Sequence, residues 1–308
     1  MALVTSDFLA GLMTSYQAIF QTAFTEADKK AAWSKLCLVL SSFSDKESYN
    51  WLEAVPSLSE WLDTRKIYGL SAKEYELTNR NYEGTISVDR NTLEDDKYNL
   101  IAPRVKQLAV RAANHPAKLI FQLLNAGAST KTYDGVNFFD TSREFGDSGT
   151  INNIVASGAY AADSDKIRTG IGKAVALMRG FKDNRGEFLD LVPDTIACSP
   201  AMEIPIRTAL APAVTGSVRP EAELIRNIMV SPYLTSGATA GHDYYLLATE
   251  NELKPMLFQM RKRPEFVALD KPTDHDAFMS RQLYYGIEGR WAAALLEPRA
   301  AVMVDCSD

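Results

Sequence analysis

Residues 75–79 and 82–89 read Tyr75-Glu76-Leu77-Thr78-Asn79 and Tyr82-Glu83-Gly84-Thr85-Ile86-Ser87-Val88-Asp89, and this pair of stretches decides the fold. Their apolar side chains recur at every second position, which predicts two half-buried strands. The residues between them, Asn79-Arg80-Asn81, suit a tight turn because Asn tolerates a left-handed backbone. We therefore expect a β-hairpin over residues 75–89.

An isolated hairpin is only marginally stable in water, so this one needs a surface to pack against. Its outer face is charged, so the apolar face packs either on the core of its own chain or on another copy of the chain. We expect the second arrangement, in which the contact residues are Tyr75, Leu77, Tyr82, Ile86 and Val88. If so, replacing Ile86 by a charged residue should block assembly and leave the subunit folded. An unfolded subunit would instead mean that the hairpin packs on the core of its own chain.

A long amphipathic helix is predicted to follow the hairpin. The acidic run Leu93-Glu94-Asp95-Asp96 favours a helix start. Apolar side chains spaced by three, four or seven then form one stripe: Ile101, Val105, Leu108, Ala112, Leu119 and Leu123. Pro116 predicts a kink or a restart, and His115 beside it is expected to be a cap or surface residue. Gly127 is the expected C-terminal cap.

The remaining chain predicts an α+β fold without regular βαβ alternation. Helical patterns cover most of the first 60 residues, residues 163–181 and residues 202–210. Strand patterns cover residues 194–200, 227–232, 244–248, 283–291 and 300–304.

Composition and charge exclude several classes of protein. The chain has 308 residues, no apolar run of about 20 residues, and no basic start typical of a signal peptide. Its three cysteines are far apart, which favours buried thiols in a reducing compartment over disulfides or a zinc site. The net charge of −6 and the lack of a basic, aromatic-rich patch argue against a nucleic-acid-binding protein.

The motifs that carry catalytic or metal chemistry are incomplete. Gly146-Asp147-Ser148-Gly149 matches the nucleophile region of trypsin-like proteases, but His242 and His275 follow the serine and His115 lies on a helix. Gly170-Ile171-Gly172-Lys173 lacks the first glycine of a phosphate loop and falls inside a predicted helix. The last candidates, which form no closed ligand set, are His242-Asp243, Asp274-His275-Asp276 and Glu94-Asp95-Asp96. We expect no enzyme, no cofactor and no metal site.

Several of these stretches together resemble the major head protein of Mu-like phages. The resemblance is carried by residues 75–96, by the helix through Asn114-His115-Pro116 and by the run Tyr133-Asp134-Gly135 to Phe138-Phe139-Asp140. Further similar stretches are Tyr49-Asn50-Trp51-Leu52, Glu60-Trp61 and Lys254 to Glu265. One departure is Thr141-Ser142-Arg143-Glu144, where the family pattern continues differently.

The resemblance implies an HK97-like capsid fold with four parts. Residues 1–60 would form an N-terminal arm and residues 61–95 an extended β-hairpin loop. Residues 96–160 and 262–308 would form a peripheral domain with a spine helix, and residues 161–261 an axial domain. As a major capsid protein, the chain would assemble in the host cytoplasm from hexamers and pentamers into the icosahedral head of a tailed bacteriophage.

The implied partners are other copies of the chain and, in addition, scaffold, portal and decoration proteins. The head would enclose double-stranded DNA without sequence-specific binding and without a membrane. An encapsulin-like cargo compartment is an alternative of the same architecture. A serine hydrolase built on Ser148 is the remote alternative from another class.

Overall fold

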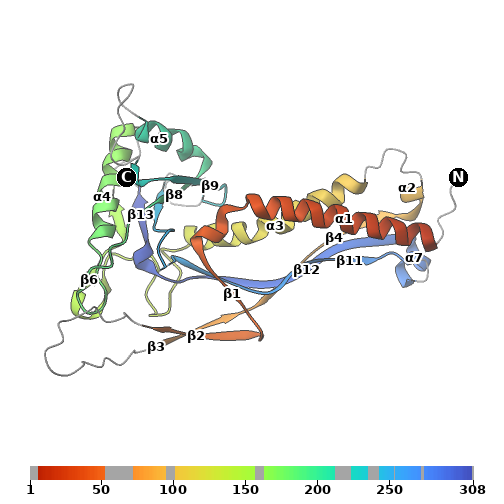
Figure 1. Cartoon of the computed structure of the whole chain (residues 1–308), viewed down its shortest axis with the longest axis horizontal. Coiled ribbons are helices and arrows are strands. Elements are labelled where there is room, and N and C mark those ends of the chain that lie inside the picture. Colours follow the sequence, from red (N-terminus) through yellow and green to blue (C-terminus); the bar gives the residue numbers. More distant parts are fainter. Residues whose placement is uncertain are drawn as a thin grey trace.

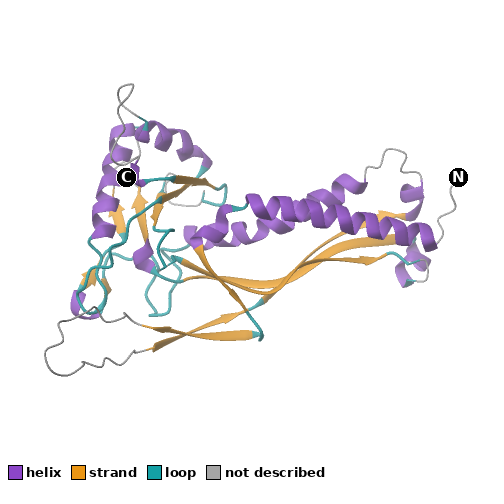
Figure 2. Ribbon diagram, in the orientation of Figure 1, coloured by secondary structure: helices purple, strands orange, loops and turns teal. Residues whose placement is uncertain are grey.

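The computed structural model describes residues 6–52, 72–94, 101–156, 163–211, 223–234, 243–252, 254–271 and 274–306. Figures 1 and 2 show a long helix-backed sheet, a compact body at one end of it, and a two-stranded ribbon that projects from the long sheet. The mixed α+β composition agrees with the sequence prediction.

Two long antiparallel strands form the centre of the extended sheet. These are β11 (Met256–Leu269) and β12 (Gln282–Leu295), flanked by β1 (Cys37–Ser41) and β4 (Arg80–Asp89) in the order β1-β11-β12-β4. Helices α1 (Ser6–Lys30) and α3 (Ile101–Asn125) lie side by side over this sheet (Figure 1). The short helices α2 (Arg90–Glu94) and α7 (His275–Ser280) lie at its distal end.

Aromatic contacts join the helices to the sheet. Tyr16 of α1 meets Tyr285 of β12 edge to face with ring centroids 5.3 Å apart, and Phe20 lies 5.5 Å from Phe266 of β11. Val105 and Ala109 of α3 are completely buried in the same cluster. This packing is the expected result of laying two amphipathic helices on one sheet face.

The compact body is built on a five-stranded sheet. Its order is β7 (Ile154–Ala156), β13 (Ala301–Asp305), β10 (Tyr244–Leu247), β8 (Thr195–Cys198) and β9 (Asn227–Val230). Helices α4 (Ser164–Arg179) and α5 (Pro200–Leu210) pack on one face, and the end of α3 with Phe138 and Phe139 packs on the other. Because both faces are covered, β8 and β10 are buried at every residue.

Minor elements complete the fold. They are the ribbon strands β2 (Lys46–Leu52) and β3 (Ala72–Thr78), the small pair β5 (Arg143–Glu144) and β6 (Thr150–Ile151), and the 3-10 turns η1 (Ala32–Leu36), η2 (Gly146–Ser148) and η3 (Pro298–Ala300). None of the described helices combines the length and the apolar character that a membrane crossing requires.

The predicted hairpin over residues 75–89 is wrong, although both of its strands exist. β3 pairs with β2, and β4 pairs with β12 from Gln282–Asp89 to Trp291–Arg80. Asn79 is a buried link between two sheets and not a tight turn. Alternation had identified the buried face of each strand, which does not determine the partner of the strand.

The predicted helical start of the chain ends earlier than expected. α1 stops at Lys30, and the apolar residues Cys37–Ser41 form a strand that pairs in parallel with Met256–Met260. By contrast, the helices predicted over residues 163–181 and 202–210 are confirmed, as are the later strands. Tertiary pairing with β11 therefore overrode a local helical pattern at β1.

The long central helix differs from its prediction at Pro116. It runs without a restart from Ile101 to Asn125, with Pro116 inside it. Gly127 follows the helix end, and its amide donates a hydrogen bond to the Leu124 carbonyl at 3.1 Å. It also packs closely, because a Cβ atom there would lie 2.6 Å from the ring of Phe139. The expected helix start cannot be followed, since Asp95 and Asp96 lie outside the described residues.

The observed sheets do not follow the domain limits expected from the sequence. β7 and β13 fall in segments assigned to the peripheral domain, yet they form the edge and second strand of the compact body's sheet. The ribbon occupies residues 46–78, whereas the extended loop was expected over residues 61–95.

Candidate assembly surfaces

The ribbon of β2 and β3 projects from the long sheet (Figure 1). β2 and β3 are paired over their full length, from Lys46–Thr78 at the base to Leu52–Ala72 at the outer end (Figure 2). Seven residues per strand at roughly 3.3 Å each place the outer end about 20 Å from the base. The segment 53–71 that joins the two strands lies outside the described residues.

An apolar cluster anchors the ribbon base to the long sheet. Tyr49, Tyr75 and Leu77 pack against the buried residues Leu257 and Leu296. The adjacent polar atoms are satisfied by buried Gln259, which accepts a hydrogen bond from Tyr49 Oη at 2.8 Å and donates one to the Leu77 carbonyl at 3.1 Å. The direction of the ribbon is therefore set by contacts inside one chain.

A polar turn fixes the second side of the ribbon base. The Glu47 carboxylate accepts hydrogen bonds from the Phe43 and Ser44 amides at 2.8 and 3.0 Å and from the Ser42 hydroxyl at 2.9 Å. These donors lower the pKa of Glu47 from 4.5 to about 2, the two backbone amides being the largest cause. The Asn79 side chain donates to Ser42 Oγ at 2.8 Å and so ties the end of β3 to this turn.

The five predicted contact residues fall into two groups. Tyr75 and Leu77 lie at the ribbon base, whereas Tyr82, Ile86 and Val88 lie on β4 and pack against the helices and sheet of their own chain. The latter three remain only partly buried. Their contact with another copy is therefore still a prediction, and their packing within the subunit is a fact that the sequence did not reveal.

His115, predicted as a cap or surface residue, lies in an aromatic cluster instead. Its ring centroid is 4.5 Å from that of Tyr82, and its Nδ1 atom accepts a hydrogen bond from Trp291 Nε1 at 3.3 Å. Burial, and secondarily the charge of Lys118, lowers the pKa of His115. The ring of Trp291 crosses Gly289 so closely that a Cβ atom there would lie 2.2 Å from it.

The loop that departs from the family pattern contains a buried ion pair. Arg143 is 2% exposed and pairs with Asp134, while its guanidinium also donates to Thr132 Oγ1 at 3.2 Å. It donates a further hydrogen bond to the Asn137 carbonyl. Arg143 thus closes the turn of residues 132–137 through charge-assisted hydrogen bonds.

The motifs tested for chemistry have structural roles where the structure describes them. The Ser148 hydroxyl donates to the Asp183 carbonyl and Gly170-Ile171-Gly172-Lys173 lies inside α4. Cys37, Cys198 and Cys306 are free and buried, as predicted. His242 lies outside the described residues, as do Asp95 and Asp96, so those metal candidates are not located. Among the described residues, no group of three potential metal ligands is brought together.

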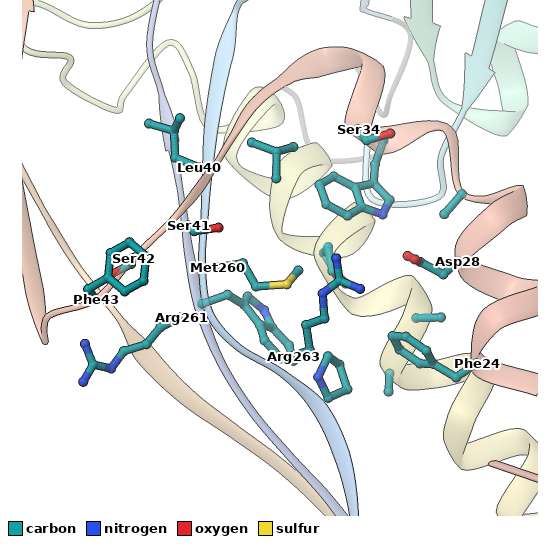
Figure 3. A pocket seen from close by; sticks show the side chains of 18 residues that line it. Phe24, Asp28, Ser34, Leu40, Ser41, Ser42, Phe43, Met260, Arg261 and Arg263 are labelled. Atoms are coloured by element: carbon teal, nitrogen blue, oxygen red, sulfur yellow. The ribbon is translucent and has the colours of Figure 1, made fainter. Parts of the chain in front are cut away.

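One open groove lies beside the ribbon base. It encloses about 530 Å³ between α1, η1, β1, β11 and α3 (Figure 3). Its lining is mainly apolar and includes Phe24, Trp33, Val39, Met260 and Pro264. Arg263 points into the middle of the groove, and Arg261 extends on the side of Phe43 (Figure 3).

A compact sheet body, a long sheet backed by a spine helix, and a projecting ribbon together define the class of HK97-like capsid subunits. A profile described as Mu-like prophage major head subunit gpT matches residues 9–166 and 227–296, more than half of the chain. The chain therefore belongs to the Mu-like prophage major head subunit family. It is a capsid protein of a tailed phage, which confirms the class inferred from sequence.

Three relatives illustrate the range of the similarity. The major capsid protein of Escherichia phage Mu is 26% identical over 94% of this chain and 71% of its own length. The procapsid subunit of bacteriophage JBD30 superposes with a TM-score of 0.55 at 24% identity, covering 95% of this chain and 74% of that one. A virus-like particle from Pyrococcus furiosus gives 0.55 at 11% identity, over 94% and 99%. The two structural likenesses establish the fold alone.

Proposed function

We propose that this chain assembles through rings of six and five copies into the icosahedral head of a tailed phage. The observation that carries the proposal is the ribbon β2–β3, which is anchored at its base and projects from the long sheet (Figure 1). A closed shell needs contacts that repeat around rotation axes, and an arm that leaves its own subunit supplies one such contact. Membership of the major head subunit family supports the same conclusion.

We assign the parts of the shell subunit as follows. The compact body with α4 and α5 faces the ring centre as the axial domain and includes β7 and β13. The long sheet with α1 and α3 forms the peripheral domain, and the ribbon over residues 46–78 is the extended loop. This assignment keeps the axial domain, the peripheral domain and the extended loop expected from the sequence, and it moves their limits to the observed sheets. Helix α1 of the expected N-terminal arm is assigned to the peripheral domain.

The five predicted contact residues have different roles in this assignment. Tyr75 and Leu77 lie on the extended loop, so their outer portions are suited to meet a neighbouring subunit. Tyr82, Ile86 and Val88 first stabilise their own subunit and contribute to a neighbour only through the surface that remains exposed.

The proposed contents of the head are double-stranded DNA held without sequence-specific contacts. A net charge of −6 fits a container wall, because tight phosphate contacts would oppose both packing and release of the genome. Scaffold, portal and decoration proteins are the further proposed partners, and assembly takes place in the host cytoplasm. No catalytic step is part of the proposal.

The test is electron microscopy of the purified protein and of lysates from infected cells. Closed icosahedral shells are expected, and a protein that stays monomeric or dimeric under all assembly conditions contradicts the proposal. An encapsulin-like compartment is the second candidate, since the archaeal virus-like particle is matched over nearly its whole length. DNA inside particles purified from infected cells supports the phage head, and enclosed enzyme cargo supports the compartment.

The hydrolase alternative has its own test. A fluorophosphonate probe labels serines that are activated by a neighbouring base. The Ser148 hydroxyl instead donates a hydrogen bond to the Asp183 carbonyl, and no histidine among the described residues is bonded to it. We expect no labelling of Ser148, and covalent modification at that residue would reopen the enzymatic hypothesis.

A further inference from the structure

The charges of helix α3 have a single sign. Its 25 residues include four basic side chains and no acidic one, although the whole chain has 39 acidic residues and a net charge of −6. Opposite charges three or four positions apart stabilise a surface helix by pairing. α3 cannot form such a pair, so its positive charge is not neutralised from within the helix. One of the four, Lys106, lines a hollow on the side of α1.

The other three basic residues share one face of the helix. Arg104, Arg111 and Lys118 follow one another at intervals of seven residues, and seven residues make almost two full turns. Their side chains therefore form a row about 21 Å long. Arg104 and Arg111 are exposed, and Lys118 is half-buried. The exposed amides of Gln107 and Asn114 stand between them and can also donate hydrogen bonds. These five residues are called the donor row.

The cations of the donor row have no acidic partner within the described part of the chain. Arg104 donates a hydrogen bond to Gln107 Oε1 at 3.1 Å, and the Lys118 ammonium lies 5.9 Å from the centroid of a tyrosine ring. Arg111 lines a pocket together with Glu83, but no ion pair joins the two. Three positive groups are therefore available to an anionic partner.

The face of the long sheet that the helices leave uncovered has a different charge pattern. Glu265, Glu288 and Glu83 stand directly opposite one another on β11, β12 and β4. Their neighbours along the strands pack under the helices, so alternation places the three carboxylates on the other face. Lys262 and Arg290 already pair with acidic residues of the chain. One side of the sheet thus presents carboxylates, and the helix side presents the donor row.

A polyanion with regularly spaced charges fits the donor row. Double-stranded DNA carries one negative charge per roughly 1.7 Å of its axis, and arginine, lysine and amide side chains are common donors to its phosphates. A protein partner would also require large apolar anchors, and Val110 is the single large apolar side chain exposed on α3. The ribbon and the helices lie on opposite sides of the long sheet, so the ribbon leaves the donor row uncovered (Figure 1).

We propose that Arg104, Arg111 and Lys118 of each subunit contact the phosphate backbone of the packaged double-stranded DNA, so that the helix side of the long sheet faces the interior of the head. The inference rests on the proposed shell function and assigns the side of the wall that meets the genome. Three ionic contacts per subunit are weak and carry no sequence information. The DNA therefore stays free to move during packing and release.

Binding of DNA by unassembled subunits tests the donor row. The row variant carries Arg104→Gln, Arg111→Gln and Lys118→Gln, and the probe is a fluorescent duplex of random sequence whose anisotropy reports binding. Each phosphate contact contributes about 0.9 to the slope of log affinity against log salt, so the slope of the row variant should be smaller by about 2.7. This difference corresponds to about 40-fold in affinity between about 50 and 200 mM salt. At the lower salt concentration the row variant should bind at least about tenfold more weakly than wild type.

The matched control removes three positive charges elsewhere on the surface. It carries Lys46→Gln, Arg226→Gln and Lys262→Gln, and each of these residues belongs to an ion pair within the chain. Its salt slope should equal that of wild type, and its affinity should stay within about threefold. Arg104→Lys combined with Arg111→Lys keeps the charge of the donor row and should retain binding.

Thermal unfolding shows whether each variant is folded. If the row variant unfolds, the three single substitutions provide the same test, and each should lower the slope by about 0.9. Equal losses of affinity in the row variant and the control would indicate a general effect of net charge and would overturn the inference. Wild-type subunits that bind polyglutamate but not the duplex would also overturn it and assign the donor row to an acidic protein. Absence of shells for wild type in electron microscopy would instead reject the proposed function.

Discussion

Gly127 and Gly172 form a matched pair of glycines with opposite surroundings. A Cβ atom at Gly127 would lie 2.6 Å from the Phe139 ring and 3.0 Å from the Leu124 carbonyl, whereas one at Gly172 in α4 meets nothing within 4 Å. Gly127→Ala should therefore destabilise the subunit by about 1 to 3 kcal/mol through overpacking. Gly172→Ala should stabilise it by up to about 1 kcal/mol because helical glycine is costly.

Denaturant unfolding of the two variants and wild type measures both effects. A shift of the unfolding midpoint in opposite directions is expected. Equal shifts of the same sign would show that Gly127 is not held by the Phe139 contact.

Glu47 makes the turn at the ribbon base sensitive to acid. Its pKa in the folded chain is about 2, lowered from 4.5 chiefly by the Phe43 and Ser44 amides. A lowered folded pKa means that the contribution to stability is complete above the unfolded value and is lost as the pH falls through the folded value. Protection of these two amides from hydrogen exchange should thus decline between about pH 4.5 and pH 2.

Glu47→Gln is the control for this acid response. The variant should show weaker protection of the Phe43 and Ser44 amides at neutral pH and no decline across the same interval. An identical decline in the variant would assign the response to another group.

Some properties of single residues could be predicted from the sequence, and others could not. The burial of the three cysteines and the helix-capping Asp163, which accepts a hydrogen bond from the Asp165 amide at 2.9 Å, follow from local rules. The Arg143–Asp134 pair and the His115–Trp291 contact join residues brought together only by the folded chain. No local pattern marks such partners, because their chemistry depends on burial that the sequence does not display.

At the scale of the element, β4 shows how a strand can be identified correctly and placed wrongly. Its apolar face packs on α1, α3 and β12 of the same chain, so Ile86→Asp should place a charge in that interface. We now expect the subunit itself to lose about 2 kcal/mol or more of stability. This expectation differs from the one drawn from the isolated hairpin, in which only assembly was affected.

Ser87→Asp provides the control on the same strand. Ser87 is exposed on the opposite face, so its substitution should leave unfolding of the subunit nearly unchanged. Chemical denaturation of unassembled subunits compares the two variants. A stable Ile86→Asp subunit that fails to form shells would return the contact to the interface between copies.

β11 is the element that periodicity did not predict. Its first four residues are buried on both faces, and from Met260 onward half-buried and exposed residues alternate through a basic run. The strand passes from the junction with the compact body into the helix-backed sheet, so one fourteen-residue strand carries two burial patterns. A search for one regular spacing of apolar residues does not find such a strand. The family resemblance nevertheless covered part of the same stretch.

At the scale of the whole molecule, the parts that stabilise the subunit differ from the ribbon that is proposed to contact a neighbour. The long sheet, the compact body and the ribbon base each bury their apolar residues within one chain. The ribbon is joined to the long sheet at its base by Tyr49, Tyr75 and Leu77. A subunit built in this way is able to fold first and assemble afterwards, because the arm is not needed to complete its core.

This separation predicts the effect of shortening the arm. Leu52 and Ala72 face each other in the last register pair of the ribbon, so residues 53–71 can be replaced by Asn-Gly, which closes a two-residue hairpin. The subunit should keep its unfolding midpoint, since Tyr49, Tyr75 and Leu77 still anchor the base. Shell formation should be lost. A variant with residues 53–71 in scrambled order keeps length and composition and should fail equally, and normal shells from either protein would mean that the arm's sequence has no part in assembly.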